Sequence, residues 1–398
     1  MNIGMLKTEL YKIYSKKVIW VALLVFLGLF LTLKLQFINM TGVKYTLEPM
    51  RAELERAVIN EAFHNYVQKS NYHCSAEEMK QFIPVSVFEY IEQYYGNERI
   101  YRSLNSDLVS IINNYFERVD NRKMYIDELN QEVILQKDSS LAKAKRKLLQ
   151  DYQDSSVSIM LNLESSANNF IDVNHSAIFP GLIMLIIIVG LAGIYSDEYT
   201  NGTQAALLTS RKGRKGVFFS KLCATDIFTI SIVFIMEAFF MIVTAICYHA
   251  PSGTISAAST YGFSLTTYGG SIYGFCFRQI LGTILGGFVL GSIVMCISAY
   301  SKSALIPFFA AGIFYGGTAV YANMIVFPAY LSSIWSLPGE LSIFMLQTQV
   351  ELVAEGHYTN VFGFIVPTLV LNVIFNVLLM VICYILCYRA YTQKQVSE

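Results

Sequence analysis

Residues 222–248 have the sequence LCATDIFTISIVFIMEAFFMIVTAICY, a long apolar run with two charged residues, Asp226 and Glu237. A helix needs about 20 predominantly apolar residues to cross the hydrocarbon core of a bilayer, and residues 222–248 exceed that length. Six segments of the chain are long and apolar enough: residues 18–38, 177–195, 222–248, 272–299, 304–327 and 361–388. The sequence therefore predicts an all-α membrane protein with six transmembrane helices.

The composition agrees with this prediction and excludes several other classes. Of 398 residues, 54% are hydrophobic and 15% are charged, with no net charge, whereas soluble proteins carry about 25% charged residues. The mean hydropathy is +0.45. Such a chain is neither disordered nor a disulfide-rich scaffold, and it lacks the basic excess of a protein that binds nucleic acid.

Lysine and arginine are distributed unevenly between the short segments that flank the spans. Four precede the first span, five lie in residues 196–221, one lies between spans four and five, and two follow span six, which makes twelve. Residues 249–271 and 328–360 have none. Because short cytoplasmic segments retain Lys and Arg, we expect both termini in the cytoplasm.

Residues 39–175 form a charged insert between the first two spans. The insert has fifteen basic and twenty acidic residues, and long domains are translocated regardless of charge, so we expect it outside the cell. Apolar residues recur at helical spacing, for example at Leu104, Leu108, Ile111 and Tyr115. We therefore predict an extracellular helical domain, a bundle or a stalk, whose mildly acidic surface is either simply solvated or attracts cationic ligands.

Residues 1–17 form a basic lead-in to the first span. Leu6, Leu10, Ile13 and Tyr14 fall on one face of a helix, and four lysines cover the remainder. This pattern is typical of a cytoplasmic amphipathic helix that lies in the headgroups. An ordinary basic flank of a membrane span explains it equally well.

The sequence lacks the common catalytic motifs. It has no G-x-x-x-x-G-K-[ST] phosphate loop, no H-E-x-x-H and no G-x-S-x-G. Cys383 and Cys387 are four residues apart, but no His or carboxylate joins them, so apolar packing explains them better than a metal site. We predict no catalytic residue, no metal site and no cofactor bound by this chain.

The loop of residues 196–221 is the most informative segment between spans. Asp197 and Glu198 leave the membrane, Asn201 and Gly202 indicate a turn, and Thr203 is a candidate cap for a short helix with an apolar face. A basic cluster follows. These features favour a docking element for a partner protein, and the alternative is an anchor that rests on lipid.

This loop and the topology together resemble the permease subunits of type-2 ABC exporters. In that family the loop forms the coupling helix, which seats on a separate ATPase subunit. The resemblance implies that ATP and Mg bind to the ATPase, and that two permeases, identical or paralogous, function with two ATPases in the bacterial cytoplasmic membrane. The large insert departs from many members and leaves the cargo open. The residues that match the coupling segment are Glu198, Gly202, Thr203, Leu207, Leu208, Thr209 and Arg211.

Glu237 and Arg278 lie inside predicted spans, where ionisable groups are costly and often functional. Glu237 and Arg278 fall at depths that differ by about 7 Å at 1.5 Å per residue. We expect them to form either a structural ion pair or a gate in the outer half of the membrane.

Residues 328–360 are too apolar for a solvent loop and too broken for a span. Pro338 and Gly339 interrupt helices, while Tyr330 and Trp335 prefer the membrane interface. We expect a re-entrant or interfacial hairpin on the outer face, which the family resemblance also implies at the exit of the pathway.

Together these features favour the permease subunit of an ABC exporter. A pathway rich in Phe, Tyr, Met and Gly suits an amphipathic or hydrophobic cargo, such as a peptide antibiotic, a lipid or a drug. The alternative is a membrane sensor or scaffold that transports nothing and whose external domain binds a ligand.

Overall fold

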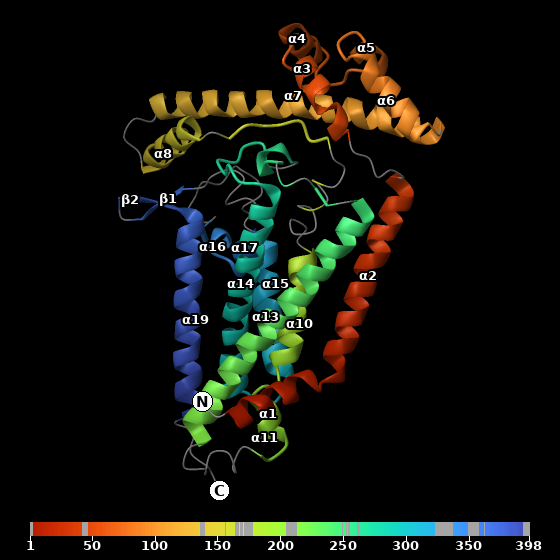
Figure 1. Cartoon of the computed structure of the whole chain (residues 1–398). Helices are drawn as coiled ribbons and strands as arrows, with labels where there is room; N and C mark the ends of the chain where they lie inside the picture. Colours follow the sequence, from red (N-terminus) through yellow and green to blue (C-terminus); the bar gives the residue numbers. More distant parts are fainter. Residues whose placement is uncertain are drawn as a thin grey trace.

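The chain divides into a bundle of long helices and a second helical layer beyond one end of that bundle (Figure 1). The computed structural model describes residues 3–41, 47–96, 98–135, 140–155, 157–163, 167, 170, 178–203, 213–248, 250–251, 253, 255–260, 263–322, 337–348, 358–361 and 363–392.

The bundle and the elements at its ends contain helices from both halves of the chain. They are α1 (Ile3–Tyr14), α2 (Lys17–Thr41), α10 (Ile178–Leu191), α11 (Ser196–Thr200), α13 (Gly213–Tyr248), α14 (Ile272–Tyr300), α15 (Leu305–Tyr321), α16 (Leu337–Glu340), α17 (Ile343–Thr348) and α19 (Thr368–Thr392). The second layer contains the elements of the predicted external domain. These are η1 (Glu48–Met50), α3 (Arg51–Val58), α4 (Glu61–Lys69), α5 (Ala76–Met79), α6 (Val85–Tyr95), α7 (Glu98–Leu135) and α8 (Ser140–Asp154).

Five helical segments within the described residues are long and apolar enough to cross a membrane. They are Lys17–Leu35, Phe179–Thr200, Arg214–Tyr248, Ile272–Tyr300 and Thr368–Thr392. The predicted fifth span corresponds to α15, whose 17 residues extend about 26 Å at 1.5 Å per residue. The prediction of a multi-pass, mostly helical membrane protein is therefore confirmed.

The last span differs from its predicted bounds, and the chain is not purely helical. Residues 361–367 were expected in a helix, but β1 (Tyr358–Val361) and β2 (Phe364–Pro367) form an antiparallel hairpin, and α19 begins only at Thr368. Gly363, at φ 95°, makes the turn between the strands. Val361, Phe364, Ile365 and Val366 are β-branched or aromatic and favour a strand when a turn residue separates them.

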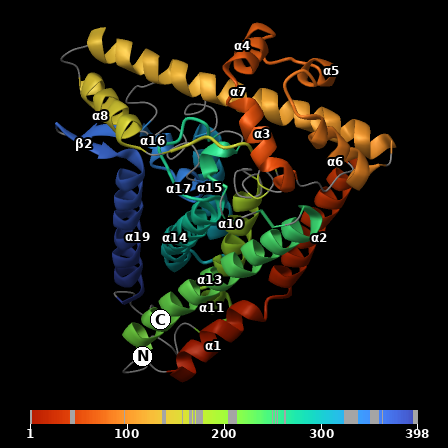
Figure 2. The ribbon, with the colours of Figure 1, turned by 45° about the horizontal axis from the view of Figure 1, so that its top comes forward.

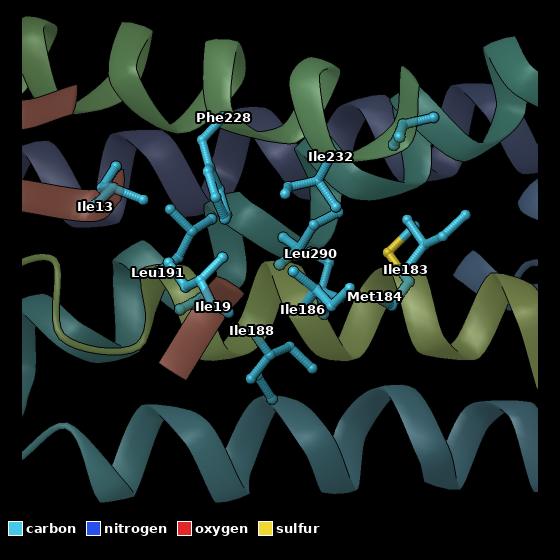
Figure 3. Packing of buried hydrophobic residues seen from close by; sticks show 14 of the residues in the cluster. Ile13, Ile19, Ile183, Met184, Ile186, Ile188, Leu191, Phe228, Ile232 and Leu290 are labelled. Atoms are coloured by element: carbon cyan, nitrogen blue, oxygen red, sulfur yellow. The ribbon is translucent and has the colours of Figure 1, made fainter. Parts of the chain in front are cut away.

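The second predicted span, α10, occupies the centre of the bundle. Of its apolar window 72% is buried, against 17% for α2 and for α19. Figure 3 shows Met184 and Leu191 from α10 packed with Phe228 from α13 and Leu290 from α14. Most exposed side chains of α2 and α19 are aliphatic or aromatic, as expected for helices that face lipid.

Glycines allow α10, α13 and α14 to approach closely. A Cβ atom at Gly287 of α14 would lie 2.5 Å from Thr229 of α13, and one at Gly190 of α10 would lie 2.4 Å from the Phe228 ring. Helix association in lipid depends on such close packing, because lipid tails are as apolar as the side chains.

The segment before α19 enters the bundle instead of covering it. All six residues of α17 are buried, packed against α14, α15 and α19. Asn372 of α19 donates hydrogen bonds to the carbonyl oxygens of Glu340 (2.5 Å) and Ser342 (3.1 Å), and Asn376 donates to that of Leu341 (3.0 Å). Non-helical backbone at membrane depth requires such internal partners.

Of the residues predicted to form the external hairpin, Pro338 and Gly339 are placed within α16. They therefore do not end a helix there. Proline is tolerated in a first helical turn, because the amide hydrogens of that turn have no partner within the helix. Tyr330 and Trp335 lie outside the described residues.

The second layer has its own core and is attached to the bundle by polar contacts. Its core includes Leu54, Phe63, Ile91, Ile112 and Phe116. The long helix α7 crosses above the bundle in Figures 1 and 2, with α8 beside it. The domain is helical, as predicted, and its described helices range from four residues in α5 to 38 residues in α7.

Two arginines of α7 donate hydrogen bonds to the loop that joins α13 to α14. Arg118 donates to the carbonyl oxygen of Ser259 (2.6 Å), and Arg122 donates to those of Ser264 (2.9 Å) and Thr266 (2.8 Å). The Arg122 guanidinium also lies 4.9 Å from the centre of the Tyr152 ring. Burial lowers the pKa of Arg122, which still remains charged.

We predict that Arg122→Gln loosens this loop. The carbonyl oxygens of Ser264 and Thr266 lose their charged hydrogen-bond donor. Amide hydrogen exchange in residues 255–270 should therefore become faster, while exchange in α14 stays unchanged. Hydrogen exchange with mass spectrometry measures this. Arg56→Gln, on the exposed face of α3, is the control. Equal protection of the loop in both variants would contradict the role of Arg122.

Candidate functional site

A buried group of ions lies at the end of the bundle opposite the helical layer. Figure 1 shows α1, α11 and the first turns of α13 together at that end. Lys221 of α13 is at the centre, with its side chain fully buried. Glu9 of α1 and Glu198 of α11 are its acidic partners.

The Lys221 ammonium group finds an acceptor for each of its three hydrogens. Its Nζ lies 2.8 Å from Oε2 of Glu9, 2.7 Å from Oε1 of Glu198 and 2.7 Å from the carbonyl oxygen of Ile194. The ring of Tyr195 lies 5.1 Å away, within the range of a cation–π contact. A buried ammonium is tolerated when it is paired and hydrogen-bonded in this way.

A second lysine balances the charge of the group. Lys12, one turn after Glu9, places its Nζ 2.7 Å from Oε1 of Glu9 and 3.1 Å from Oε1 of Glu198. Two lysines and two glutamates thus form a neutral network that joins α1, α11 and α13. Beside it, Nζ of Lys16 lies 3.1 Å from Oδ2 of Asp197.

The chain between α10 and α11 is shaped to bring both acids to the lysines. A Cβ at Gly193 would lie 2.1 Å from Oδ2 of Asp197, so glycine gives the room for this turn. Ser298 of α14 accepts hydrogen bonds from the backbone N–H groups of Tyr195 (3.1 Å) and Ser196 (3.2 Å). These contacts supply acceptors for N–H groups where α11 begins.

The electrostatics of Glu9 and Lys12 follow from this geometry. Burial alone raises the pKa of Glu9, but Lys221 and Lys12 outweigh it and hold that pKa below its usual value. Burial alone lowers the pKa of Lys12, but Glu9 and Glu198 raise it above its usual value. Both groups are therefore charged at neutral pH.

Half of the predicted coupling segment lies within the described residues. Asp197 and Glu198 make the ion pairs above. Gly202 has φ 69° and forms the predicted turn, and the Thr203 hydroxyl donates to the carbonyl oxygen of Glu198 (3.4 Å). Leu207, Leu208, Thr209 and Arg211 lie outside the described residues.

Glu9 and Lys221 were not among the predicted site residues. Glu9 is the only acid among the lysines of residues 1–17, and it shares a helix face with Ile13, four residues on, which is also buried. The four-residue spacing between Glu9 and the apolar Ile13 was the feature of the sequence that could have indicated a buried Glu9. Lys221 follows the basic cluster of the loop, and its burial among acids from two other elements required the tertiary structure.

The structure does not bring Glu237 and Arg278 together. Among the described residues no ion pair joins them: Glu237 is buried and its Oε2 has no hydrogen-bond partner, while the Arg278 guanidinium lies 5.0 Å from the centre of the Tyr268 ring. Arg278 is in the second turn of α14, and Tyr268 belongs to the loop that precedes this helix. Asp226, a further acid in α13, lies 3.3 Å from the Tyr384 hydroxyl of α19.

The two cysteines considered for a metal site lie on α19. Both are buried, and Sγ of Cys387 lies 3.7 Å from the carbonyl oxygen of Met295 on α14. Within the described part of the chain no three His, Cys, Asp or Glu side chains gather as metal ligands do.

Comparison of the chain with protein-family models, curated proteins and solved structures gives no match. Its function is therefore inferred from its own residues.

We predict that Lys221→Met destabilises the chain by about 3–5 kcal/mol, because Glu9 and Glu198 lose their central cation while still buried. Lys215→Met, on the exposed side of α13, should change the free energy of unfolding by less than about 0.5 kcal/mol. Unfolding of the purified chain by a denaturing detergent measures both. Similar values for the two variants would show that the network does not stabilise the bundle.

The pKa of Glu9 also predicts a response to acid. Because the pKa of Glu9 is lower in the folded chain than its ordinary value of 4.5, ionised Glu9 stabilises the fold above pH 4.5. This stabilisation is lost as the pH falls through the pKa of the folded state. The raised pKa of Lys12 adds stability that persists up to its ordinary value of 10.5 and is lost only above it. The Tm should therefore fall on acidification below about pH 4.5, and fall less in Glu9→Gln. An equal fall in both proteins would exclude Glu9 as a source of acid sensitivity.

Proposed function

We propose that this chain is the membrane-spanning permease subunit of a type-2 ABC exporter. In this proposal it moves an amphipathic or hydrophobic cargo across the bacterial cytoplasmic membrane, and a separate ATPase subunit binds ATP and Mg. The chain itself performs no covalent chemistry. The observation that carries the proposal is the buried network of Lys221, Glu9, Lys12 and Glu198.

The network supports a coupling role for residues 197–203 because of what it connects. Glu198 belongs to the segment that resembles a coupling helix, and it is tied to α13 through Lys221 and to α1 through Lys12. Separating a buried ion pair leaves uncompensated charges and costs several kcal/mol. A displacement of this segment by an ATPase would therefore move α1 and α13 with it.

The packing of the bundle supports a coordinated movement of the spans. α13 contacts α14, and both contact the central α10. Alternation between inward and outward openings would require these helices to shift together, with ATP binding to the partner supplying the bias between the two states. Two such permeases, identical or paralogous, would assemble with two ATPases.

The distribution of basic residues supports the proposed orientation. Five basic residues lie at or next to the helix ends opposite the helical layer in Figure 1. They are Lys12 on α1, Lys16 between α1 and α2, Lys221 near the start of α13, Lys302 just after α14, and Arg389 near the end of α19. This asymmetry is typical of a cytoplasmic face. The layer of α3–α8 would then be extracellular.

The groups buried near the outer half of the bundle favour a cargo with few charges. The Tyr315 hydroxyl donates to Oε1 of Gln347 (2.7 Å), and Gln279 donates to the carbonyl oxygen of Thr348 (2.8 Å). These side chains are uncharged and surrounded by apolar ones. A wall of this kind suits a peptide antibiotic, a lipid or a drug better than a polar solute.

We predict that the chain, expressed with its neighbouring genes, co-purifies with a P-loop ATPase, and that Leu207→Asp with Leu208→Asp abolishes the association. Two carboxylates on the apolar face of the loop would be desolvated by docking and would oppose it. Ile134→Asp with Leu135→Asp, at exposed positions near the end of α7, is the matched control.

The result should be quantified as the ratio of ATPase to permease after purification in mild detergent. Absence of any ATPase, or an unchanged ratio in the Leu207/Leu208 variant, would contradict the proposal. Loss of the ATPase in the control as well would mean that general destabilisation explains the effect. In the first two cases a sensor or scaffold that transports nothing becomes the better explanation.

A further inference from the structure

The β1–β2 hairpin is an uncharged apolar element with an exposed tip. None of residues 358–367 is charged. Phe364, at the tip opposite Val361, has 75% of its surface exposed. The turn is fixed by Gly363, whose N–H donates to Oδ1 of Asn360 (2.8 Å). A large aromatic side chain is thus held at the end of a defined turn and away from the protein.

The position of the hairpin along α19 sets its depth. β2 ends at Pro367 and α19 starts at Thr368, with no residue between them. The first charged residue of α19 is Arg389, and about 20 helical residues span the hydrocarbon core. Counting back from Arg389 places the outer boundary of the hydrocarbon near Leu369. The hairpin therefore lies at the level of the outer headgroups.

Among the described residues, the hairpin packs against α8 and the start of α19. Its first strand lies against α8, where the Tyr358 hydroxyl donates to Asp151 and the Tyr358 ring joins Leu129 and Leu148. Figure 1 shows the hairpin extending sideways from the top of α19, away from the other spans. A lone two-stranded hairpin is marginally stable in water, and the contact with α8 stabilises the first strand but leaves Phe364 at the tip exposed.

We propose that the tip of the β1–β2 hairpin binds the outer leaflet of the membrane, with Phe364 inserted at the boundary between headgroups and acyl chains. Phe, Trp and Leu side chains of elements that lie on a membrane are buried at this boundary. On its outer edge β2 has no partner strand within the described residues, so the N–H and C=O groups there need water or headgroup partners, which disfavours a deeper position. Through Tyr358 the hairpin holds α8, and with it the end of α7, at the membrane surface.

Lipid fits the tip better than a second copy of the chain. The exposed surface adjoins α19, whose outward side chains Val370, Ile374 and Phe375 are also exposed and aliphatic or aromatic. The tip thus continues a surface that the bilayer already covers. Burial by another protein molecule remains a distinct outcome of the test below.

The test uses the full chain in vesicles, with Phe364→Trp in a background of Trp20→Phe and Trp335→Phe, which removes both native tryptophans. We expect blue-shifted tryptophan emission and a loss of intensity when the acyl chains carry bromine near the headgroup. Val361→Trp, on the facing strand, should behave in the same way. This test needs no ATPase, so its failure is separate from a failure of the proposed function.

The control is Ile59→Trp, between α3 and α4, at a position that is 80% exposed and belongs to the part of the layer farthest from the bundle in Figure 1. Its emission should be red-shifted and insensitive to bromine. If both hairpin variants emit like this control, the tip is in water and the inference is wrong. Blue-shifted emission that bromine does not quench would mean that protein covers the tip, and would overturn it equally.

Discussion

The pairing of Lys221 with Glu9 and Glu198 is the constraint on which the cytoplasmic end of the proposed topology depends. An ammonium group that is fully buried at the end of a span must be neutralised and hydrogen-bonded. Here Glu9 comes from α1, and Glu198 comes from α11, the short helix that follows α10. The lead-in helix, the loop and α13 are consequently fixed to one another, and the apolar contacts of Ile13 and Phe228 complete the same junction.

The opposite end of the bundle is held by contacts of a different kind. Arg118 and Arg122 bind carbonyl oxygens of the loop between α13 and α14, and Tyr358 binds Asp151 of α8. Among the described residues, the helical layer thus contacts the loop between α13 and α14 and the β1–β2 hairpin that precedes α19. That loop follows the end of α13, so α13, which carries Lys221 near its start, leads from the buried network to the arginine contacts.

Much of the fold followed from the apolar pattern, and most of the site did not. The sequence predicted six spans, and five of them correspond to helices that are long and apolar enough to cross a membrane; the helical insert and the turn at Gly202 were also predicted from local sequence. The hairpin before α19 was missed, since a run of apolar residues at a membrane boundary is ambiguous between helix and strand. The Glu237–Arg278 pair was inferred from depth alone, and depth does not specify which way a side chain faces. Asn372 and Asn376 were overlooked, although they anchor the residues between α16 and α17.

The amino-acid pattern alone predicts which segments are apolar enough to cross a membrane and which short segments between them are basic. Both follow from the transfer of side chains between water and hydrocarbon, which depends on composition over about 20 residues. Only the tertiary structure decided that Glu9, separated from Lys221 by 212 positions along the chain, is its partner, and that α17 enters the bundle. Those outcomes depend on which buried polar groups can reach each other, and that is a property of the packed helices together.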